Sequence, residues 1–309
     1  MRKKALDCIF SLAKQDGRVV FIGSDLGPGV LDSMKTSMPS RFYMEGISEQ
    51  HIIGMSAGLA LEGFIPFVNT IATFLTRRCF EQIAIDLCLQ DLPVRLVANG
   101  GGAVYAPLGP THLAIEDIAI LRPLPNMTIV APCDSGEMER LIASTADWPH
   151  PIYIRLAKGG DEIISDHKNG FEIGKAILMR PSGSGIFIST GVMTQLALKA
   201  SDILAQEGIS CGVLHMHTVK PLDHECLASL IPLVDGVVTI EEHARIGGMG
   251  TAILEFCNDF MPIEAQKISR IGIPDSFADQ YGNQNSLLGH WGITVDQICY
   301  EMRRKLKGI

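Results

Sequence analysis

The sequence predicts an α/β protein of two domains, each built on an open, mostly parallel sheet with helices on both faces. Short apolar runs alternate with longer helical stretches along the whole chain. This alternation stops in a polar, glycine-rich segment between residues 157 and 185 and then begins again. The chain has 309 residues, of which 47% are hydrophobic and 19% charged, so it can bury the cores of two domains.

The first α/β unit is expected to span residues 1–165. Three apolar runs have the character of buried parallel strands, at 19–23, 94–98 and 128–130. Helical stretches are expected between them, at about 2–15, 49–62, 76–90, 112–121 and 134–146. Asp134 or Ser135 can cap the last of these helices, because both follow Pro132 at its predicted start.

A second, smaller unit follows the polar segment. We place a linker at 166–184 and a C-terminal domain at 185–309, a length that fits one small domain. Its strands are expected near 186–190, 211–215, 236–240 and 267–271. Its helices are expected near 192–207, 223–231, 249–259 and 294–307.

Composition excludes several classes of function. The net charge of −8 argues against a nucleic-acid-binding surface. The most apolar stretch, 52–68, is broken by Glu62 and Pro66, which argues against a membrane span. Asp7 and Lys14 interrupt the N-terminal apolar stretch, so no signal peptide is expected. The eight cysteines form no CxxC pair and indicate buried thiols in a cytoplasmic protein without a zinc site.

Glu49 stands at the start of an unusual helix. The residues at 54–60 are Gly, Met, Ser, Ala, Gly, Leu and Ala, so most of the side chains there are small. Small side chains let another backbone approach closely, as helices that cross at a subunit interface require. A carboxylate beside such an interface can be desolvated, which lets it share a proton with a ring nitrogen. The alternative is a charge that only complements the helix dipole.

Three further segments carry candidate functional side chains. Phe74 and Phe80 lie on either side of Arg77. Taken alone, the two aromatics could be core residues and the arginine a solvated charge. His112 follows Gly-Pro-Thr at a predicted helix start, where the dipole disfavours the imidazolium. Arg155 lies at the end of a predicted strand, where open sheets bind ligands, and a guanidinium suits phosphate or carboxylate.

In this order, the segments resemble the aminopyrimidine-binding domain of transketolase-like thiamin diphosphate enzymes. The resemblance runs along nearly the whole chain and is to the second half of a transketolase, a pyrimidine-binding domain followed by a C-terminal domain. Thr-Phe-Leu-x-Arg at 73–77 is most similar to deoxyxylulose-phosphate synthases and bacterial split transketolases. The resemblance implies a transferase subunit that helps move a two-carbon ketol unit from a ketose (phosphate) to an aldose (phosphate).

The resemblance also implies roles for individual residues. Glu49 would bind the aminopyrimidine and activate the cofactor, and Phe74 would stack on the ring. His112 would contact substrate oxygens and relay protons, while Arg77 and Arg155 would anchor the anionic end of the substrate. Weaker matches add the substrate contact Arg2 and the cofactor contacts Asp25, Leu26, Ile47 and Phe80.

The chain departs from full-length transketolases in three ways. It has no Gly-Asp-Gly followed by a distant Asn, the motif that holds Mg²⁺ and the diphosphate. Leu108 replaces an Asp that usually binds a sugar hydroxyl. Gly29 and glycines 100–102 stand where side chains often contact phosphate, although their N–H groups could form an anion nest. The donor and acceptor sugars are therefore left open.

The missing motif implies that this chain holds only the pyrimidine end of thiamin diphosphate and no metal ligand. Mg²⁺ would be bound mainly by a separate N-terminal transketolase subunit. Homodimerisation through this chain would then give an α2β2 heterotetramer in the cytoplasm. Three other functions fit the same residues: the beta subunit of a 2-oxo acid dehydrogenase decarboxylase component, a deoxyxylulose-phosphate synthase-like carboligase, and a non-catalytic complex partner.

Overall fold

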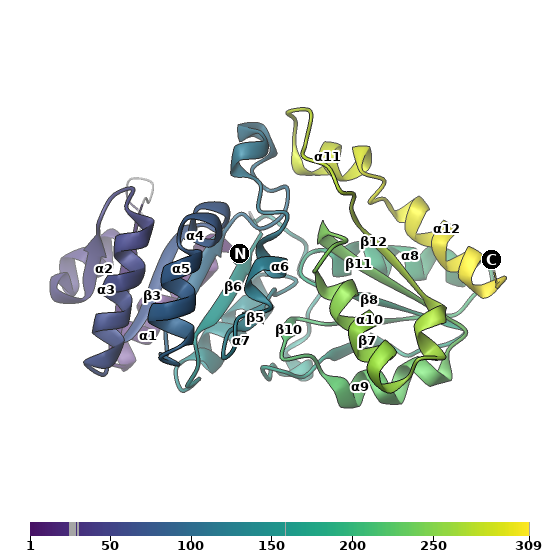
Figure 1. Ribbon diagram of the computed structural model, residues 1–309, viewed down its shortest axis with the longest axis horizontal. Coiled ribbons are helices and arrows are strands. Elements are labelled where there is room, and N and C mark those ends of the chain that lie inside the picture. Colours follow the sequence, from purple (N-terminus) through teal and green to yellow (C-terminus); the bar gives the residue numbers. More distant parts are fainter. Residues whose placement is uncertain (25–28, 30, 158, 309) are drawn as a thin grey trace.

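The chain forms two sheets side by side, each with helices on both faces (Figure 1). The computed structural model describes all residues except 25–28, 30, 158 and 309. The predicted fold class, two α/β domains with mostly parallel sheets, is confirmed. Among the described residues, no helix combines the length and the apolarity that a membrane span requires.

Seven strands make the first sheet. Their order is β10 (Thr218–Lys220), β5 (Thr128–Val130), β6 (Ile152–Leu156), β4 (Arg95–Asn99), β3 (Ile65–Ile71), β1 (Val19–Gly23) and β2 (Phe42–Met44). All neighbours are parallel except β10 and β5. The helices are α1 (Arg2–Gln15), α2 (Asp32–Ser37), α3 (Glu49–Leu61), α4 (Ala72–Arg78), α5 (Phe80–Gln82), a π-helical segment (Ile83–Cys88), α6 (Asp117–Leu121) and α7 (Ser135–Thr145).

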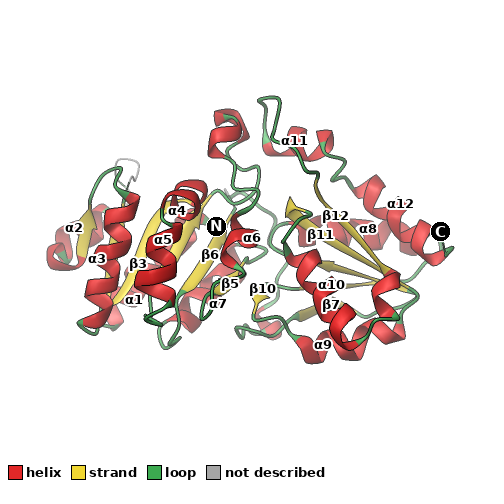
Figure 2. Cartoon of the chain, in the orientation of Figure 1, coloured by secondary structure: helices red, strands yellow, loops and turns green. Residues whose placement is uncertain are grey.

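Five strands make the second sheet. Their order is β12 (Ile268–Ile273), β11 (Gly236–Ala244), β8 (Gly185–Ser189), β9 (Cys211–His215) and β7 (Ile177–Arg180), and only the β7–β9 pair is antiparallel. The helices are α8 (Met193–Gln206), α9 (His224–Leu230), α10 (Met249–Phe260), α11 (Gln284–His290) and α12 (Val295–Leu306). Both strand groups, with β10 between them, can be followed in Figure 2.

Alternating side chains of the central strands fill a core on each face of the first sheet. On β3 and β4, Val68 and Leu96 pack towards α3 and α4, whereas their neighbours Phe67 and Val97 pack towards α1 and α7. Successive strand residues point to opposite faces, so a fully apolar run indicates a strand that is buried on both sides. The predicted strands at 19–23 and 94–98 accordingly lie inside the sheet, between other strands, and the second is buried although it contains Arg95.

Three local predictions differ from the structure, each for a physical reason. The helix predicted over 112–121 begins only at Asp117, because Ala114 pairs with Gly102 in a short β-bridge and holds the preceding chain extended. β7 lies inside the range predicted as a linker, because its register with β9 builds it into the second sheet. β3 was not predicted, since Pro66, Asn69 and Thr70 interrupt its apolar run.

Buried polar side chains join the two domains. Glu137 in α7 lies 2.8 Å (Oε2 to Nε2) from His215 at the end of β9 and accepts the backbone N–H of Cys133 at 2.7 Å. His215 Nδ1 lies 2.8 Å from the hydroxyl of Thr194. Burial alone would raise the pKa of Glu137, but the neighbouring His215 lowers it to about 2. Cys133, Glu137 and His215 lie close enough to hold a metal ion, yet these contacts already use the Glu137 Oε2 oxygen.

His217, at the same joint, is buried and stacks on Phe171 with 4.2 Å between ring centroids. Its Nδ1 lies 2.9 Å from Thr218 Oγ1, and its Nε2 has no hydrogen-bond partner within the part of the chain that the structure describes. Burial lowers the pKa of His217 to about 4, although Glu137 acts in the opposite direction. The folded chain therefore holds this imidazole neutral.

We predict that His217→Phe makes the stability of the chain less sensitive to acid. Between pH 6.5 and 4 the unfolded chain binds a proton that folded His217 refuses, so the wild-type free energy of unfolding falls as the pH falls. The loss from His217 should reach about 2–3 kcal/mol at pH 4.5. Phenylalanine keeps the stack on Phe171 and removes the titration. Denaturant unfolding at pH 7 and pH 4.5 measures this, with His167→Phe as the exposed control. An equal loss in both variants would contradict the prediction.

Candidate active site

The first sheet brings functional side chains together at the carboxyl edge of its parallel strands. The chain leaving β2 leads to Glu49, the first residue of α3. β3 runs directly into α4, which carries Phe74 and Arg78. The loop after β4 carries His112. Because all these connections leave the same edge of the sheet, residues far apart in the sequence meet there.

Glu49, Arg78, Phe74 and His112 form a continuous row. The side chain of Glu49 is only 4% exposed, and its Oε2 accepts a hydrogen bond from Arg78 Nη1 at 3.0 Å. The Arg78 guanidinium lies over the Phe74 ring, with its carbon 4.2 Å from the ring centroid. The Phe74 and His112 rings meet edge to face, with 5.1 Å between their centroids. We call these residues the Glu49 row.

Arg78 is the functional candidate that the sequence analysis missed. Arg77 was the candidate near Phe74, but Arg78, four residues after Phe74, is the one that lies over the ring. Arg77 instead forms an ion pair with Glu116 and donates to the Leu113 carbonyl at 3.1 Å. The sequence signal that could have indicated Arg78 was the pair of adjacent arginines. Adjacent residues of a helix point about 100° apart, so only one of the two can lie over Phe74.

His112 joins the row without lying at a helix start. It ends a single 3₁₀ turn, Pro110–His112, and α6 begins five residues later at Asp117. The predicted helix start at His112 is therefore wrong. Its Nδ1 lies 2.9 Å from the Thr111 hydroxyl, and the turn follows Gly109, whose φ of +78° favours glycine. The position of His112 thus depends on the loop and on the contact with Phe74.

Arg155 lies away from the row, at the joint between the domains. Its side chain is 8% exposed and forms two hydrogen bonds with Asp117, at 2.8 and 3.2 Å. It also donates to the carbonyls of Ala114 and Glu242, and the latter belongs to β11 of the second domain. Burial would raise the pKa of Asp117, but Arg155 holds it below its usual value. The substrate role predicted for Arg155 stays a prediction, since these contacts occupy its guanidinium within the chain.

The glycines at 100–102 make room for the domain joint. A side chain on Gly101 would come within 2.5 Å of Arg155, and one on Gly102 within 2.4 Å of Glu242. Their N–H groups already donate to carbonyls, those of 100 and 101 to Leu156 and that of 102 to Ala114. The anion nest predicted for this run is therefore wrong, because its donors are used inside the chain.

The remaining predicted residues lie elsewhere. Arg2 lines a separate hollow of about 330 Å³ with Gly29. Ile47 is 77% exposed and lies two residues before α3, and Phe80 is 38% exposed at the start of α5. Asp25 and Leu26 lie outside the described residues. The described residues that were predicted to bind the cofactor therefore lie either in the Glu49 row or on an exposed apolar surface.

This apolar surface comprises residues on and beside α3, α5 and the π-helical segment. Its large exposed side chains are Ile47, Leu61, Phe80, Ile85 and Leu89. On α3, Gly54 and Gly58 are also exposed and present no side chain at all. Exposed apolar side chains gathered on one pair of helices mark an interaction site. We call these residues the α3 surface.

Known proteins match the chain along nearly its whole length. The family model for the transketolase pyrimidine binding domain matches residues 1–160, and that for the transketolase C-terminal domain matches residues 174–298. One subunit of the apulose-4-phosphate transketolase of Phocaeicola vulgatus is 33% identical, over 96% of this chain and 95% of that protein. The 6-deoxy-6-sulfo-D-fructose transketolase subunit SqwH of Clostridium sp. is 32% identical, over 96% and 92% respectively.

Two other matches differ in what they cover. The 1-deoxy-D-xylulose-5-phosphate synthase of Syntrophotalea carbinolica is 36% identical over 95% of this chain, which spans only 46% of that protein. A solved structure described as a split gene transketolase, inactive beta4 tetramer, is 31% identical. It has a TM-score of 0.89 and covers 99% of this chain and 97% of its own.

We predict that Arg155→Met destabilises the folded chain by roughly 3–5 kcal/mol, because it leaves the buried Asp117 carboxylate without its partner. Thermal and denaturant unfolding of the purified chain measure the loss. Arg303→Met is the matched control, since its ion pair with Glu207 is more than a third exposed and should contribute less than about 1 kcal/mol. Unchanged stability of Arg155→Met, with loss of substrate binding in the assembled enzyme, would favour the substrate role instead.

Proposed function

Because the chain belongs to the transketolase family, we propose that it is the C-terminal subunit of a two-subunit transketolase. The observation that carries the proposal is the extent of the matches. Relatives named as transketolase subunits are matched along 95% and 92% of their own length, whereas a single-chain synthase is matched along 46%. The reaction proposed is transfer of a two-carbon ketol unit from a ketose to an aldose, an EC 2.2.1 type of transfer.

The proposed cofactor is thiamin diphosphate, with its pyrimidine end in this chain. The Glu49 row fits such a ring, because Arg78 already acts as a stand-in for it. The planar, nitrogen-bearing guanidinium lies on Phe74 and donates to the Glu49 carboxylate at 3.0 Å. An aminopyrimidine needs the same two contacts, a ring to stack on and a carboxylate to bond. When bound, thiamin diphosphate supplies an electron sink for the charge left when a carbon–carbon bond of the ketose breaks.

Each residue of the row then has a distinct task. Glu49 shares a proton with a ring nitrogen of the pyrimidine, and its burial keeps water from competing for that proton. Phe74 supports the ring, and Arg78 must move aside for both contacts to form. His112 lies at the edge of Phe74, where its imidazole can move a proton at a sugar oxygen.

Arg77 is the better candidate of the two predicted anchors for an anionic substrate. It lines an open pocket of about 550 Å³ between the domains, together with Glu116 and Phe277. Its side chain is 35% exposed, whereas that of Arg155 is 8% exposed. A guanidinium at the rim of a pocket can bind a phosphate or carboxylate in bidentate fashion. We therefore assign Arg77 to the substrate and Arg155 to the domain joint.

The proposed assembly is an α2β2 heterotetramer. The α3 surface would be covered by a second copy of this chain, because its exposed Gly54 and Gly58 allow two helices to cross closely. A separate subunit would bind the diphosphate and supply most of the Mg²⁺ ligands, because this sequence lacks the Gly-Asp-Gly motif. A relative with the same fold is described as an inactive tetramer of beta chains, which agrees with a need for a second kind of subunit.

A deoxyxylulose-phosphate synthase-like carboligase is the second candidate, because a synthase is 36% identical to the chain. The two reactions use different donors. The assembled enzyme is assayed with xylulose 5-phosphate and ribose 5-phosphate, and separately with pyruvate and an aldehyde acceptor. Ketol transfer without pyruvate consumption supports the proposal, and decarboxylation of pyruvate supports the synthase-like carboligase or the 2-oxo acid dehydrogenase subunit. No turnover of either donor by a cofactor-loaded complex would favour a non-catalytic partner.

We predict that Glu49→Gln in the assembled enzyme lowers turnover by at least about a hundredfold, because the amide cannot exchange the proton with the cofactor ring. The melting temperature and the association with the partner should stay near wild type, since the amide oxygen of glutamine can still accept the hydrogen bond from Arg78, whose side chain is 48% exposed. Glu62→Gln, an exposed carboxylate just beyond the other end of α3, is the matched control. Near-normal turnover of Glu49→Gln would sink the proposed role.

We also predict that this chain binds thiamin diphosphate only with its partner subunit. The Glu49 row offers contacts to the pyrimidine end alone, and the sequence lacks the motif for the charged end. Calorimetric titration of thiamin diphosphate and Mg²⁺ into the chain should give no heat of binding. The same titration into the mixed subunits should give a saturable curve. Saturable binding by the chain alone would show that the diphosphate site lies within it.

A further inference from the structure

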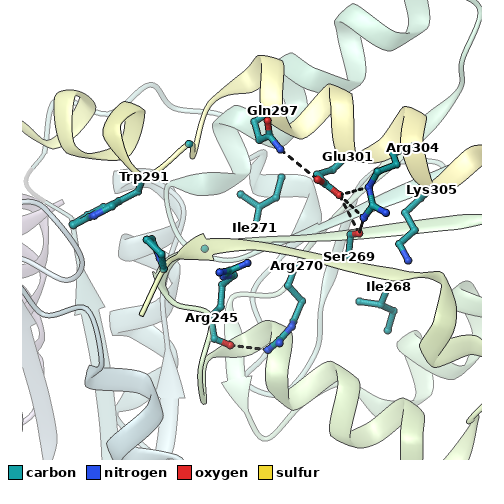
Figure 3. Close-up of a pocket in the computed structure, with 13 residues that line it drawn as sticks. Arg245, Ile268, Ser269, Arg270, Ile271, Trp291, Gln297, Glu301, Arg304 and Lys305 are labelled. Carbon is teal, nitrogen blue, oxygen red and sulfur yellow. Dashed lines mark hydrogen bonds and ion pairs between the residues drawn. The ribbon is translucent and has the colours of Figure 1, made fainter. Parts of the chain in front are cut away.

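A basic groove runs along β12, the outermost strand of the second sheet (Figure 3). It has a volume of about 510 Å³ and is lined by five consecutive strand residues, 268–272. Arg304 and Lys305 of α12 form one wall, and Arg245 and Arg270 lie on the other side of the strand. Trp291 stands at one end. The groove therefore has cations on both sides of the outer edge of β12.

Three of these cations are not neutralised within the described part of the chain. Arg270 donates to the Arg245 carbonyl at 2.7 Å and to the Thr251 hydroxyl at 2.8 Å, and Lys305 donates to the Gln266 carbonyl at 3.0 Å. These acceptors are neutral oxygens, so they hold Arg270 and Lys305 in place without neutralising their charge. No carboxylate of the described residues forms an ion pair with Arg245, Arg270 or Lys305, and Glu301, the acid of the groove, is paired with Arg304. The groove is a local positive region on a chain whose net charge is −8.

The outer edge of β12 pairs with no other strand of the described residues. β12 pairs with β11 on its inner side and is the last strand in the order of the sheet. An edge strand leaves a row of backbone N–H and C=O groups without partners. It is six residues long, enough to pair with an extended segment along about 20 Å. A small anion would use the cations but would leave this row of backbone groups unpaired.

We propose that the groove binds an extended, acidic segment of a partner polypeptide, which adds a strand to the sheet at β12. Successive residues of an extended chain point to opposite sides, so adjacent acidic residues would meet the α12 wall and the Arg245–Arg270 wall in turn. A second copy of β12 does not fit, because the same cations would face one another. The proposal is independent of the Glu49 row, which lies in the other domain.

The test uses fluorescence anisotropy with the full chain and a labelled octapeptide, Thr-Val-Asp-Glu-Asp-Val-Thr-Thr. We expect saturable binding that weakens as salt is added, because exposed charges are screened. The same peptide with Asn and Gln in place of its acids should bind far more weakly. Two further peptides carry N-methyl groups at either the odd or the even residues. Strand addition requires that one of these two loses binding, because only one edge of the peptide pairs with β12.

Arg245→Glu with Lys305→Glu should weaken peptide binding by roughly tenfold or more, because one charge is reversed on each wall. Neither side chain forms an ion pair with another described residue, so the fold should survive, as circular dichroism checks. The control is the double variant Lys168→Glu with Lys199→Glu, whose two positions are exposed outside the groove. It makes the same change in net charge and should bind the peptide like wild type. Strand addition would be overturned if the chain bound pyrophosphate but not the peptide. It would also be overturned if both N-methylated peptides bound equally well. Absence of any binding would show that the cations only protect the edge.

Discussion

The buried ion pair of Arg155 and Asp117 holds the two domains and the active-site loop in one arrangement. Removing two charges from water costs several kcal/mol for each ion, and only full hydrogen bonding offsets such a cost. Here Asp117 accepts from Arg155 and from the Tyr153 hydroxyl at 2.7 Å, while Arg155 also binds a carbonyl from each domain. The pair lies where β6, the start of α6 and β11 converge. Displacing β6 or α6 would leave a buried charge unpaired, and displacing β11 would remove the Glu242 carbonyl that Arg155 binds.

The position of His112 in the Glu49 row follows from that joint. Glycines 100–102 let the loop after β4 pass close to Arg155 and Glu242, and Ala114 anchors its far end to Gly102. His112 lies between these two fixed points and reaches Phe74 on α4. The row therefore combines two rigid helices with one pinned loop. Phe74 and His112 are thereby positioned in advance, whereas Arg78 must turn away before the proposed pyrimidine can contact Phe74 and Glu49.

The sequence predicted what depends on local pattern and missed what depends on distant contacts. Apolar runs identified β1, β4 and β5, and the small-residue stretch placed Glu49 at the start of α3. The start of α6 was missed, because the β-bridge from Gly102 to Ala114 joins residues that no local pattern connects. Arg78 was missed for a similar reason. Which arginine of the 77–78 pair turns towards Phe74 is decided by the orientation of α4 on the sheet and by the Glu49 carboxylate, which comes from another helix.

The α3 surface and the basic groove lie at opposite ends of the molecule, with α3 in the first domain and α12 at the far side of the second (Figure 1). They also differ in chemistry, since one is apolar with exposed glycines and the other is cationic along an open strand edge. A partner that fits one cannot fit the other, because burying uncompensated cations against an apolar face would be costly. A second copy of the chain on α3 therefore leaves β12 accessible. An acidic segment docked at β12 would add a further protein to the complex without competing for the proposed contact between two copies of the chain at α3.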